Sequence, residues 1–412
     1  MESSTLKRLS VLMATVFVDM VGFTMVLPLL PFYATEFGAE PWQVGALVAT
    51  YAFAALVMAP FWGRASDRLG RRPLILAGLL GSGIAYLLFG LAHSLWLLFA
   101  ARFVQGAGSG GITGVVQAYV ADSVPPGERA KALGWVTAAT SAGVMLGPAL
   151  GSFAAGLSQE APGFLAAGLC LLNVLSAWRW LPEPAVHEHG GAPPRRLRRA
   201  FIEVLTHPMS PVHACIWLYA IGMLAFMGMN GVLALFLKDT FGVTKETIGY
   251  FYVYVGGIGL IMRALLLGPA VRRFGELGVV RLGAVSLMVG LGCIPIPAFL
   301  DAPLAVRFLL LAVIALLVPV GTALLFPATT ALVSSRSVRS ETGQTLGVQQ
   351  SFGGISRMVG PLAAGALYEV SFGFPFWVAS ALMLCGTFLT TRLRNEAPVV
   401  ETKEEMARAE AG

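Results

Sequence analysis

Long apolar runs, separated by short polar connections, are the feature that most constrains how this chain can fold. Each run is close to the ~20 residues that an α-helix needs to cross the hydrocarbon core of a bilayer. Only 12% of the residues are charged, whereas an ordinary soluble domain has roughly 25%, so we expect an integral membrane protein. The runs predict twelve membrane-spanning helices, at about residues 9–34, 42–62, 73–92, 95–120, 132–157, 163–181, 211–237, 244–267, 277–299, 304–332, 343–368 and 375–393.

The distribution of lysine and arginine predicts how the chain is oriented. If the N-terminus is cytoplasmic, the outer connections carry only Lys238 and Lys245, and the clusters of basic residues all lie in the inner connections. The positive-inside rule then places both termini in the cytoplasm, and we expect the chain in the plasma (inner) membrane. Because the basic residues alternate between connections and do not gather on one face, we expect no nucleic-acid partner.

Two sequence patterns recur in the second half of the chain. The sequence G-R-A-S-D-R-L-G-R-R-P at 63–73 returns in weaker form as G-P-A-V-R-R-F-G at 268–275. A glutamate, a glycine and a Gly-Pro pair follow one another in 128–148, and the same pattern returns in 341–361. Repeats that each lie between membrane-length runs indicate two homologous bundles.

The predicted fold is therefore an all-α membrane protein, with twelve transmembrane helices in two pseudo-symmetric six-helix bundles. A polar stretch separates the bundles, and its basic amphipathic part is expected to lie at the inner membrane surface. The expected division is a first bundle at 1–185, a cytoplasmic linker at 186–210, a second bundle at 211–394 and a cytoplasmic tail at 395–412.

Several motifs of the first half resemble those of one transporter family. The sequence at 63–73 resembles the signature between helices 2 and 3 of the major facilitator superfamily. R-F-V-Q-G-A-G at 102–108 is similar to the helix-4 motif of that superfamily's proton-driven exporters, and D-M-V-G-F-T-M-V-L-P at 19–28 is similar to their helix-1 motif. Their helix-5 motif, with the spacing G-x8-G-x3-G-P-x2-G, resembles the arrangement of Gly134, Gly143, Gly147, Pro148 and Gly151.

The first half is most similar to the twelve-helix drug:proton antiporters, which include the tetracycline exporters. This resemblance implies a secondary active transporter, not an enzyme, that exports amphipathic organic compounds or drugs in exchange for protons by alternating access. It implies a monomer whose partners are a small-molecule substrate, protons and membrane lipid, with no cofactor and no metal. Ala85 stands where the tetracycline exporters carry an acid, so the resemblance leaves open whether tetracyclines are substrates.

Asp19 is the one carboxylate that we expect deep inside a span, roughly 16 Å from its inner end at a rise of 1.5 Å per residue. Arg102 in the fourth span reaches a comparable depth. An ionisable residue within the membrane indicates a functional site, because burying its charge is costly. Burial favours the protonated carboxyl and a neighbouring guanidinium favours the carboxylate, so a modest rearrangement could switch the protonation of Asp19. We interpret the pair as a proton-coupling site; a permanent structural ion pair is the alternative.

The connection at 63–73 is interpreted as a conformational latch. Asp67 could accept hydrogen bonds from free N–H groups at a helix start, where the helix dipole favours an anion. The family pattern points to the start of the eleventh span, near 342–344. Arg68 or Arg71 would pair with Asp122, and a basic turn that only sets the topology is the alternative. The residues assigned to the latch are Gly63, Asp67, Arg68, Gly70, Arg71 and Asp122.

The glycines of the fifth span suggest close helix packing. Gly143, Gly147 and Gly151 are four residues apart and share one helix face, where small side chains allow another helix to approach. Pro148 within this face favours a bend. Ordinary helix packing is an equal interpretation from the residues alone. The resemblance implies a hinge contact between the bundles, with Gly134 as part of the same motif.

A central cavity is expected between the bundles. Thioether and amide side chains would suit varied amphipathic ligands, although methionine at helical spacing is more often ordinary packing. Arg357 is either a cation of this cavity or a group that bonds the backbone and locks a helix, and the same two interpretations apply to Arg263. The candidate cavity residues are Gln105, Met223, Met227, Asn230, Gln350 and Arg357, with Gln349 beside them.

Other functions are compatible with the same fold. Proton-coupled uptake of organic anions, or transport of lysolipids between leaflets, would make use of the deep arginines. A membrane-embedded enzyme or receptor would need a polar catalytic cluster or a large outer domain, and we find neither in the sequence.

Overall fold

The computed structural model describes residues 3–184, 197–337 and 341–392, and every element in these ranges is a helix. The helices of the first half are α1 (Ser3–Val26), α2 (Leu30–Glu36), α3 (Pro41–Leu69), α4 (Arg71–Gly90), α5 (Leu95–Ser109), α6 (Ile112–Ser123), α7 (Arg129–Ala155) and α8 (Ala161–Trp180). Those of the second half are α9 (Leu197–Thr206), α10 (Pro211–Phe241), α11 (Ile248–Ile261), α12 (Leu267–Cys293), α13 (Leu304–Ala315), α14 (Leu317–Arg336), α15 (Thr342–Val370) and α16 (Phe374–Arg392).

Within the described residues, eight helical segments are long and apolar enough to cross a membrane, judged by length and composition. The span predicted at 95–120 is divided into α5 and α6 at Gly110 and Gly111, where a Cβ would overlap residues of α3. The spans predicted at 244–267 and 277–299 lie in one helical segment, which has a π-helical turn at Met262–Leu266 and a kink between the two spans at Gly275, where φ is 70°. The all-helical membrane fold is thus confirmed, and the number of twelve spans stays a prediction.

Local sequence explains where several helices begin and end. Pro41 opens α3 at a position where a missing N–H costs no helical hydrogen bond. The side chains of Glu40 and Gln43 cap this helix reciprocally. Gly70 ends α3 with φ 98° and Gly242 ends α10 with φ 66°, in the region of backbone conformation that favours glycine.

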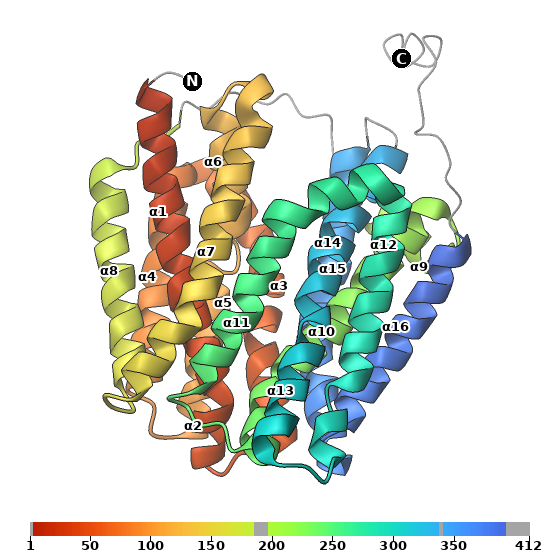
Figure 1. Cartoon of the computed structure of the whole chain (residues 1–412). Helices are drawn as coiled ribbons and strands as arrows, with labels where there is room; N and C mark the ends of the chain where they lie inside the picture. The colour runs from red at the N-terminus through yellow and green to blue at the C-terminus, as the bar shows by residue number, and fades with distance from the viewer. Residues whose placement is uncertain (1–2, 185–196, 338–340, 393–412) are drawn as a thin grey trace.

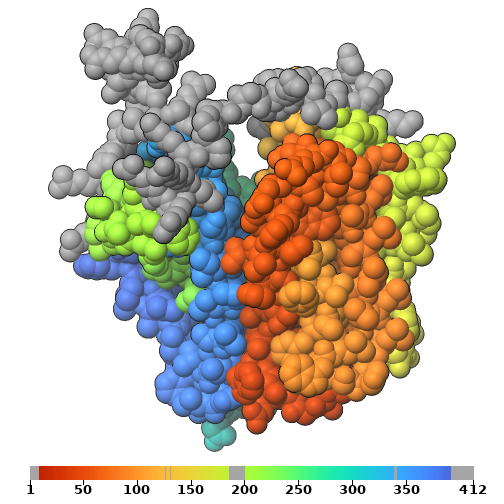
Figure 2. Space-filling model, turned by 180° about the vertical axis from the view of Figure 1, so that it is seen from behind, coloured from red at the N-terminus to blue at the C-terminus, as the bar shows by residue number. Residues whose placement is uncertain are grey.

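The helices of the first half lie on one side of Figure 1 and those of the second half on the other, with the start of α1 and the end of α16, the termini of the described chain, at the same end. The helix α3 packs along α15, and α7 packs along α11, so these two pairs join the halves. The approach of α3 to α15 is close: a Cβ on Gly45 would overlap the carbonyl of Pro361, and one on Gly365 would lie 2.6 Å from the carbonyl oxygen of Pro41. Figure 2 shows this seam from behind, with the two halves in contact toward the end opposite the termini.

Part of the predicted linker is a helix that packs on the second half. Residues 186–196 of this linker, including the basic residues at 195–196, and the tail at 395–412 lie outside the described residues. Within α9, Phe201 stacks on Phe352 of α15 with ring centroids 4.7 Å apart. The indole of Trp217 on α10 donates to the carbonyl of Val204 (3.1 Å). The end of the linker is therefore joined to α10 and α15.

Candidate functional site

Asp19 lies on α1 and is buried, with 5% of its surface exposed. Its carboxylate accepts one weak hydrogen bond, from the hydroxyl of Ser82 on α4 (3.3 Å). A buried carboxylate is normally balanced by a cation or several hydrogen bonds, because the charged form loses its hydration. Asp19 therefore lies in surroundings where gain or loss of a proton changes the local energy strongly.

Arg102 lies on α5 and is also buried, at 2% exposure. Its Nη1 donates to the side-chain oxygen of Gln105 (2.5 Å), and the Gln105 amide donates to the hydroxyl of Tyr86 on α4 (2.9 Å). The guanidinium carbon lies 4.8 Å from the ring centroid of Tyr51 and 5.8 Å from that of Phe23. Aromatic faces and a neutral amide thus surround this cation, and its Nε has no hydrogen-bond partner within the described residues.

The structure does not join Asp19 to Arg102 directly. In the part of the chain that the structure describes, neither residue forms an ion pair. The permanent ion pair that the sequence analysis left open as an alternative is therefore absent from these residues. Both groups are instead linked to adjacent turns of α4. The hydroxyl of Ser82 donates to Asp19, and the hydroxyl of Tyr86 accepts from Gln105, whose oxygen accepts from Arg102. Sequence reasoning missed Ser82, Tyr86 and Tyr51, which carry no charge and belong to no recognised motif.

The three glycines of α7 pack against α1, not against the second half of the chain. A Cβ on Gly143 would lie 2.6 Å from the carbonyl oxygen of Phe17 and 2.8 Å from Cβ of Met20. One on Gly147 would overlap the Thr24 hydroxyl, and one on Gly151 would overlap the carbonyl of Met25. The shared face was predicted, but the contact lies within the first half and does not join the two bundles. Gly134 has no atom near its missing side chain.

The contact of α7 with the second half uses other atoms. A Cβ on Gly249 of α11 would lie 2.5 Å from the carbonyl oxygen of Pro148, and the N–H of Gly249 donates to the hydroxyl of Ser152 (2.8 Å). Pro148 lies inside α7. The same helix therefore packs its glycine face on α1 and contacts α11 through Pro148 and Ser152. Its glycines set the distance to α1, next to Asp19.

Arg71 is the centre of the polar cluster at the junction of α3 and α4. Its guanidinium lies 2.7 Å from Asp67 and 2.9 Å from Asp122, and it also donates to the hydroxyl of Ser66 (2.9 Å). Arg71, and not Arg68, therefore makes the predicted contact with Asp122. Gly63 has no atom near its missing side chain.

Glu183 is a member of this cluster that sequence reasoning missed. Its carboxylate accepts hydrogen bonds from the backbone N–H groups of Arg71 (2.6 Å) and Arg72 (3.0 Å), at the start of α4. An anion at a helix start satisfies free N–H groups and complements the helix dipole. The position of Glu183 just after α8, in P-E-P, gave no sequence signal for this role.

Asp67 does not contact the start of α15 in this structure. Its side chain is 68% exposed, and within the described residues its partner is Arg71. The expected contact near 342–344 is therefore absent, and this end of the molecule, which carries both termini, is not closed by Asp67.

The polar contacts between the halves lie instead at the opposite end. Lys245 pairs with Glu36 (2.9 Å), and the ammonium of Lys238 donates to the hydroxyl of Thr35 (2.6 Å). The backbone N–H of Trp42 donates to the carboxylate of Glu369 (3.3 Å). The two basic residues predicted for the outer connections thus both bond the end of α2.

The candidate cavity residues are not brought together as one set. Met223 is buried, Asn230 donates to the Phe226 carbonyl (2.8 Å) within its own helix, and Gln350 is exposed. Gln349, next to it, is fully buried, and both its amide atoms lack a partner among the described residues. The other three candidates have different surroundings. Gln105 accepts a hydrogen bond from Arg102, Met227 is half-buried on α10, and Arg357 is half-buried on α15.

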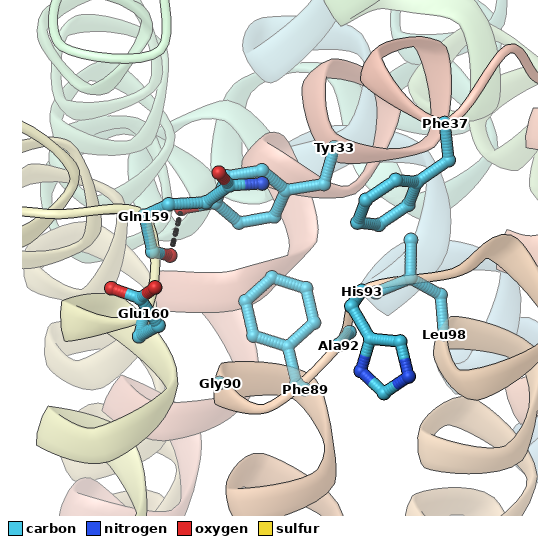
Figure 3. A pocket seen from close by; sticks show the side chains of 9 residues that line it. All are labelled: Tyr33, Phe37, Phe89, Gly90, Ala92, His93, Leu98, Gln159 and Glu160. Carbon is cyan, nitrogen blue, oxygen red and sulfur yellow. Dashed lines mark hydrogen bonds between the residues drawn. The ribbon is translucent and has the colours of Figure 1, made fainter.

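A separate pocket of about 200 Å³ lies in the first half, at the end opposite the termini. Figure 3 shows Phe89 facing Tyr33 across it, with His93 on one side and Glu160 on the other. The hydroxyl of Tyr33 donates to the carbonyl of Gln159 (2.9 Å). The sequence gave no indication of this pocket. Among the described residues, no group of three histidine, cysteine or acidic side chains is placed to hold a metal ion.

Comparison with known proteins assigns this arrangement to a family. The sequence profile of the Major Facilitator Superfamily matches residues 12–316 and 302–411. Multidrug resistance protein 2 of Bacillus subtilis (strain 168) is 28% identical over 385 residues, 92% of this chain and 93% of that protein. Tetracycline resistance protein, class G, of Vibrio anguillarum is 30% identical over 373 residues, which are 89% of this chain and 92% of that protein.

Solved structures show the same fold at low sequence identity. The human organic anion transporter MFSD10 (TETRAN) has a TM-score of 0.69 at 22% identity, over 94% of this chain and 100% of that one. A mutant of the nucleoside transporter NupG has a TM-score of 0.77 at 13% identity, over 95% of this chain and 100% of that one.

Proposed function

Since this chain belongs to the Major Facilitator Superfamily, whose members are membrane transporters and not enzymes, we propose that it exports amphipathic organic compounds in exchange for protons. The multidrug and tetracycline resistance proteins among its relatives support the drug-like class of substrate. The proposed architecture is twelve spans in two six-helix bundles, at 1–185 and 211–394, with a linker between them. Both termini would be cytoplasmic and the transporter monomeric.

The observation that carries the proposal is the buried carboxyl of Asp19. It has one weak hydrogen bond and no cation partner among the described residues. A carboxyl in this position can take up a proton in one state and release it in another when a modest movement changes its surroundings. We assign it the role of proton acceptor, with Arg102 as the nearby cation that favours release.

The packing of α7 supplies a way to change those surroundings. Gly143 packs on Phe17 and Met20, which flank Asp19 on α1. On its other side α7 contacts α11 of the second half through Pro148 and Ser152. A movement between the halves would therefore pass through α7 to the turn of α1 that carries Asp19. The glycines act here as a coupling face within the first half.

Alternating access would follow from two sets of contacts that form in turn. In the present state the contacts of Glu36 with Lys245 and of Thr35 with Lys238 hold the end opposite the termini. In the other state the end opposite the termini would open. Asp67, whose side chain is 68% exposed in the present state, would then contact the start of α15 at the other end. The ion pair of Arg71 with Asp122 would hold the connection at 63–73 in place in both states.

The membrane potential supplies enough energy for such a cycle. Moving one proton charge through 100 mV is worth about 2.3 kcal/mol, which supports a roughly fifty-fold concentration gradient of a neutral solute.

Proton release on substrate addition tests the proposal. Purified protein in weakly buffered detergent would be mixed with ethidium, norfloxacin or tetracycline, and the released protons followed with a pH indicator. We expect release from the wild type and none from Asp19→Asn. Asp301→Asn, which removes an exposed acid, is the matched control and should release protons as the wild type does.

The outcomes separate the parts of the proposal. Release that persists in Asp19→Asn would show that another group carries the proton. Release from neither protein, with binding of a test compound demonstrated by fluorescence, would exclude exchange of that compound for protons.

A further inference from the structure

We propose that the pocket of Figure 3 is an accessory binding site for a small organic ammonium ion, with the carboxylate of Glu160 as its counterion. The rings of Tyr33, Phe37 and Phe89 would contact the ligand. The site is separate from Asp19 and goes beyond the proposed transport. Its position, charge, aromatic lining and size each favour this class of ligand.

The pocket lies away from the proposed proton-coupling carboxyl. Asp19 accepts its hydrogen bond from Ser82 of α4, whereas the part of α4 that lines the pocket is its C-terminal end, at Phe89 and Gly90. The distance along the helix from Ser82 to Phe89 is roughly 10 Å at a rise of about 1.5 Å per residue. All the lining residues belong to the first half of the chain, so the pocket does not depend on a contact between the halves.

The charge of the pocket favours a cation. Its lining includes one acidic side chain, the exposed Glu160, and one histidine, His93. In the part of the chain that the structure describes, the Glu160 carboxylate forms no ion pair and no hydrogen bond. The Nδ1 of His93 donates to the carbonyl of Leu91 (3.1 Å), which leaves Nε2 of the neutral imidazole as an acceptor. A carboxylate without a counterion beside an apolar wall attracts a cation.

The charge of a lysine near this pocket is already paired. The ammonium of Lys245 lies 5.6 Å from the ring centroid of Tyr33 and 2.9 Å from the carboxylate of Glu36. Glu36 also accepts from the amide of Gln159 (3.0 Å). Lys245 and Glu36 therefore balance each other, and Glu160 is the acid of this group that lacks a partner within the described residues.

Aromatic rings form much of the pocket wall. Tyr33 and Phe89 are both buried, and their ring centroids lie 5.1 Å apart with the planes at 50°. The half-buried Phe37 and the buried Leu98 lie beside them (Figure 3). The hydroxyl of Tyr33 donates to the carbonyl of Gln159, which fixes the position of this ring. Aromatic rings attract ammonium ions through their negative faces, and the attraction is stronger where water is excluded.

The volume of the pocket restricts the size of the ligand. It is about 200 Å³, and a water molecule takes up about 30 Å³ in the liquid, so the space corresponds to about seven waters. One aromatic ring with a compact head group is of this size. A drug with several fused rings is larger, so the pocket is not a second copy of the proposed transport site.

Probes of matched size test the class of ligand. Phenyltrimethylammonium, methyl phenyl sulfone and benzenesulfonate each have one aromatic ring and a tetrahedral head group, which is positive, neutral or negative. Their binding to the purified full-length protein in phosphatidylglycerol nanodiscs would be measured by saturation-transfer NMR, with empty nanodiscs as the blank. We expect the ammonium compound to bind wild type roughly tenfold more tightly than the sulfone. Equal binding of the ammonium compound and the sulfonate would contradict the assignment.

Two substitutions locate the binding site. Glu160→Gln removes the counterion at an exposed position and should remove the preference for the ammonium compound over the sulfone. Phe37→Leu keeps an apolar side chain but removes one ring, and should weaken binding of the ammonium compound by roughly threefold.

Two further variants are controls for charge and for the transport site. Asp301→Asn removes an exposed acid in the connection between α12 and α13 and should bind the ammonium compound as wild type does. Asp19→Asn should also leave this binding unchanged. If Glu160→Gln keeps the preference, or if Asp19→Asn loses it, the ammonium compound binds elsewhere and the assignment is wrong.

A cysteine within the pocket provides a local measurement. Ala92 is half-buried and lines the pocket. Ala92→Cys would be labelled with a maleimide in a protein that also carries Cys293→Ser and Cys385→Ser. Saturating phenyltrimethylammonium should slow this labelling severalfold and should not slow the labelling of Asp301→Cys in the same background. Labelling of Ala92→Cys at an unchanged rate would overturn the assignment.

The lipid composition of the nanodiscs identifies the source of the ammonium group. The titrations would be repeated in phosphatidylcholine, whose headgroup carries a trimethylammonium group. Weaker binding of the probe in these nanodiscs supports a lipid headgroup as the ligand, and equal binding supports a soluble organic cation. Glu160→Gln, measured in both lipids, corrects for attraction of the probe to an anionic membrane surface.

This site and the proposed proton exchange fail separately. Binding of the ammonium compound with the expected preference, but without proton release by any test compound, would exclude the exchange and keep the site. Proton release that depends on Asp19, without binding of the ammonium compound in the pocket, would exclude the site and keep the exchange.

Discussion

Lys245 lies 2.9 Å from Glu36, and this ion pair joins the second half of the chain to the first at the end opposite both termini. The carboxylate of Glu36 also accepts from the amide of Gln159 (3.0 Å), which fixes its position. The pair joins the end of α2 to the connection between α10 and α11, while at the other end the exposed Asp67 makes no such contact between the halves within the described residues. In the proposed cycle this contact is one of the two closures that alternating access requires.

Loss of this ion pair should shift the protein toward a form that is open at this end. We expect Lys245→Gln to raise the population of that form by roughly fivefold at most, because a partly exposed pair is worth about 0.2–1 kcal/mol. Spin labels at the exposed Leu157 and Glu246 would report a longer distance between the halves. The double variant Glu36→Lys with Lys245→Glu should restore the wild-type distance. An unchanged distance in Lys245→Gln would show that the pair does not hold the closure.

The glycine face of α7 predicts a sharp contrast between two alanine substitutions. Gly147→Ala should lower the unfolding free energy by about 1–3 kcal/mol, the usual cost of overpacking, because its Cβ would overlap Thr24. Gly134→Ala should be neutral or stabilising by roughly 0.5–1 kcal/mol, since alanine favours a helix and this site is open. Thermal unfolding in detergent measures both. Equal midpoints for the two variants would mean that α1 and α7 do not pack closely in the populated state.

Sequence reasoning reached the parts of this molecule that depend on local pattern. Apolar runs predicted an all-helical membrane protein, and Asp19, the one carboxylate expected deep inside a span, is buried in the structure with 5% of its surface exposed. The four-residue spacing of Gly143, Gly147 and Gly151 predicted a shared face. Spacing predicts which residues share a helix face but not which helix packs against that face, so the predicted packing partner of these glycines was wrong.

The parts that sequence reasoning missed depend on contacts between distant segments. Glu183 caps a helix that begins more than a hundred residues earlier, and nothing in P-E-P distinguishes it from an ordinary turn. Ser82 and Tyr86 meet Asp19 and Gln105 only because α4 packs in one rotation against α1 and α5. The contact expected for Asp67 is absent among the described residues; our proposal assigns it to another state of the cycle, which one sequence does not distinguish from this one.

The start of α4 predicts two separable costs at Gly70. Alanine there would lie 2.6 Å from the Glu183 carboxylate and would have to adopt φ 98°. We expect Gly70→Ala to lower the unfolding free energy by about 1–3 kcal/mol. Adding Glu183→Ala removes the overlap but also removes the helix cap, which is worth about 1 kcal/mol. The double variant should therefore be less destabilised than the sum of the two single variants, as thermal unfolding in detergent would show. Simple additivity would mean that the two side chains do not meet.

Removal of one hydroxyl tests the chain from Tyr86 through Gln105 to Arg102. Tyr86→Phe leaves the amide of Gln105, which is 2% exposed, without its acceptor. An unsatisfied buried donor costs about 1–3 kcal/mol, so the midpoint of thermal unfolding in detergent should fall. Thr206→Val is the control, because that hydroxyl donates to the Ile202 carbonyl (3.0 Å) at an exposed position of α9, in the connection between the two halves, where water can replace it. If the two variants unfold at the same temperature, the buried chain contributes no more than an exposed bond, and Arg102 is then held mainly by the face of Tyr51.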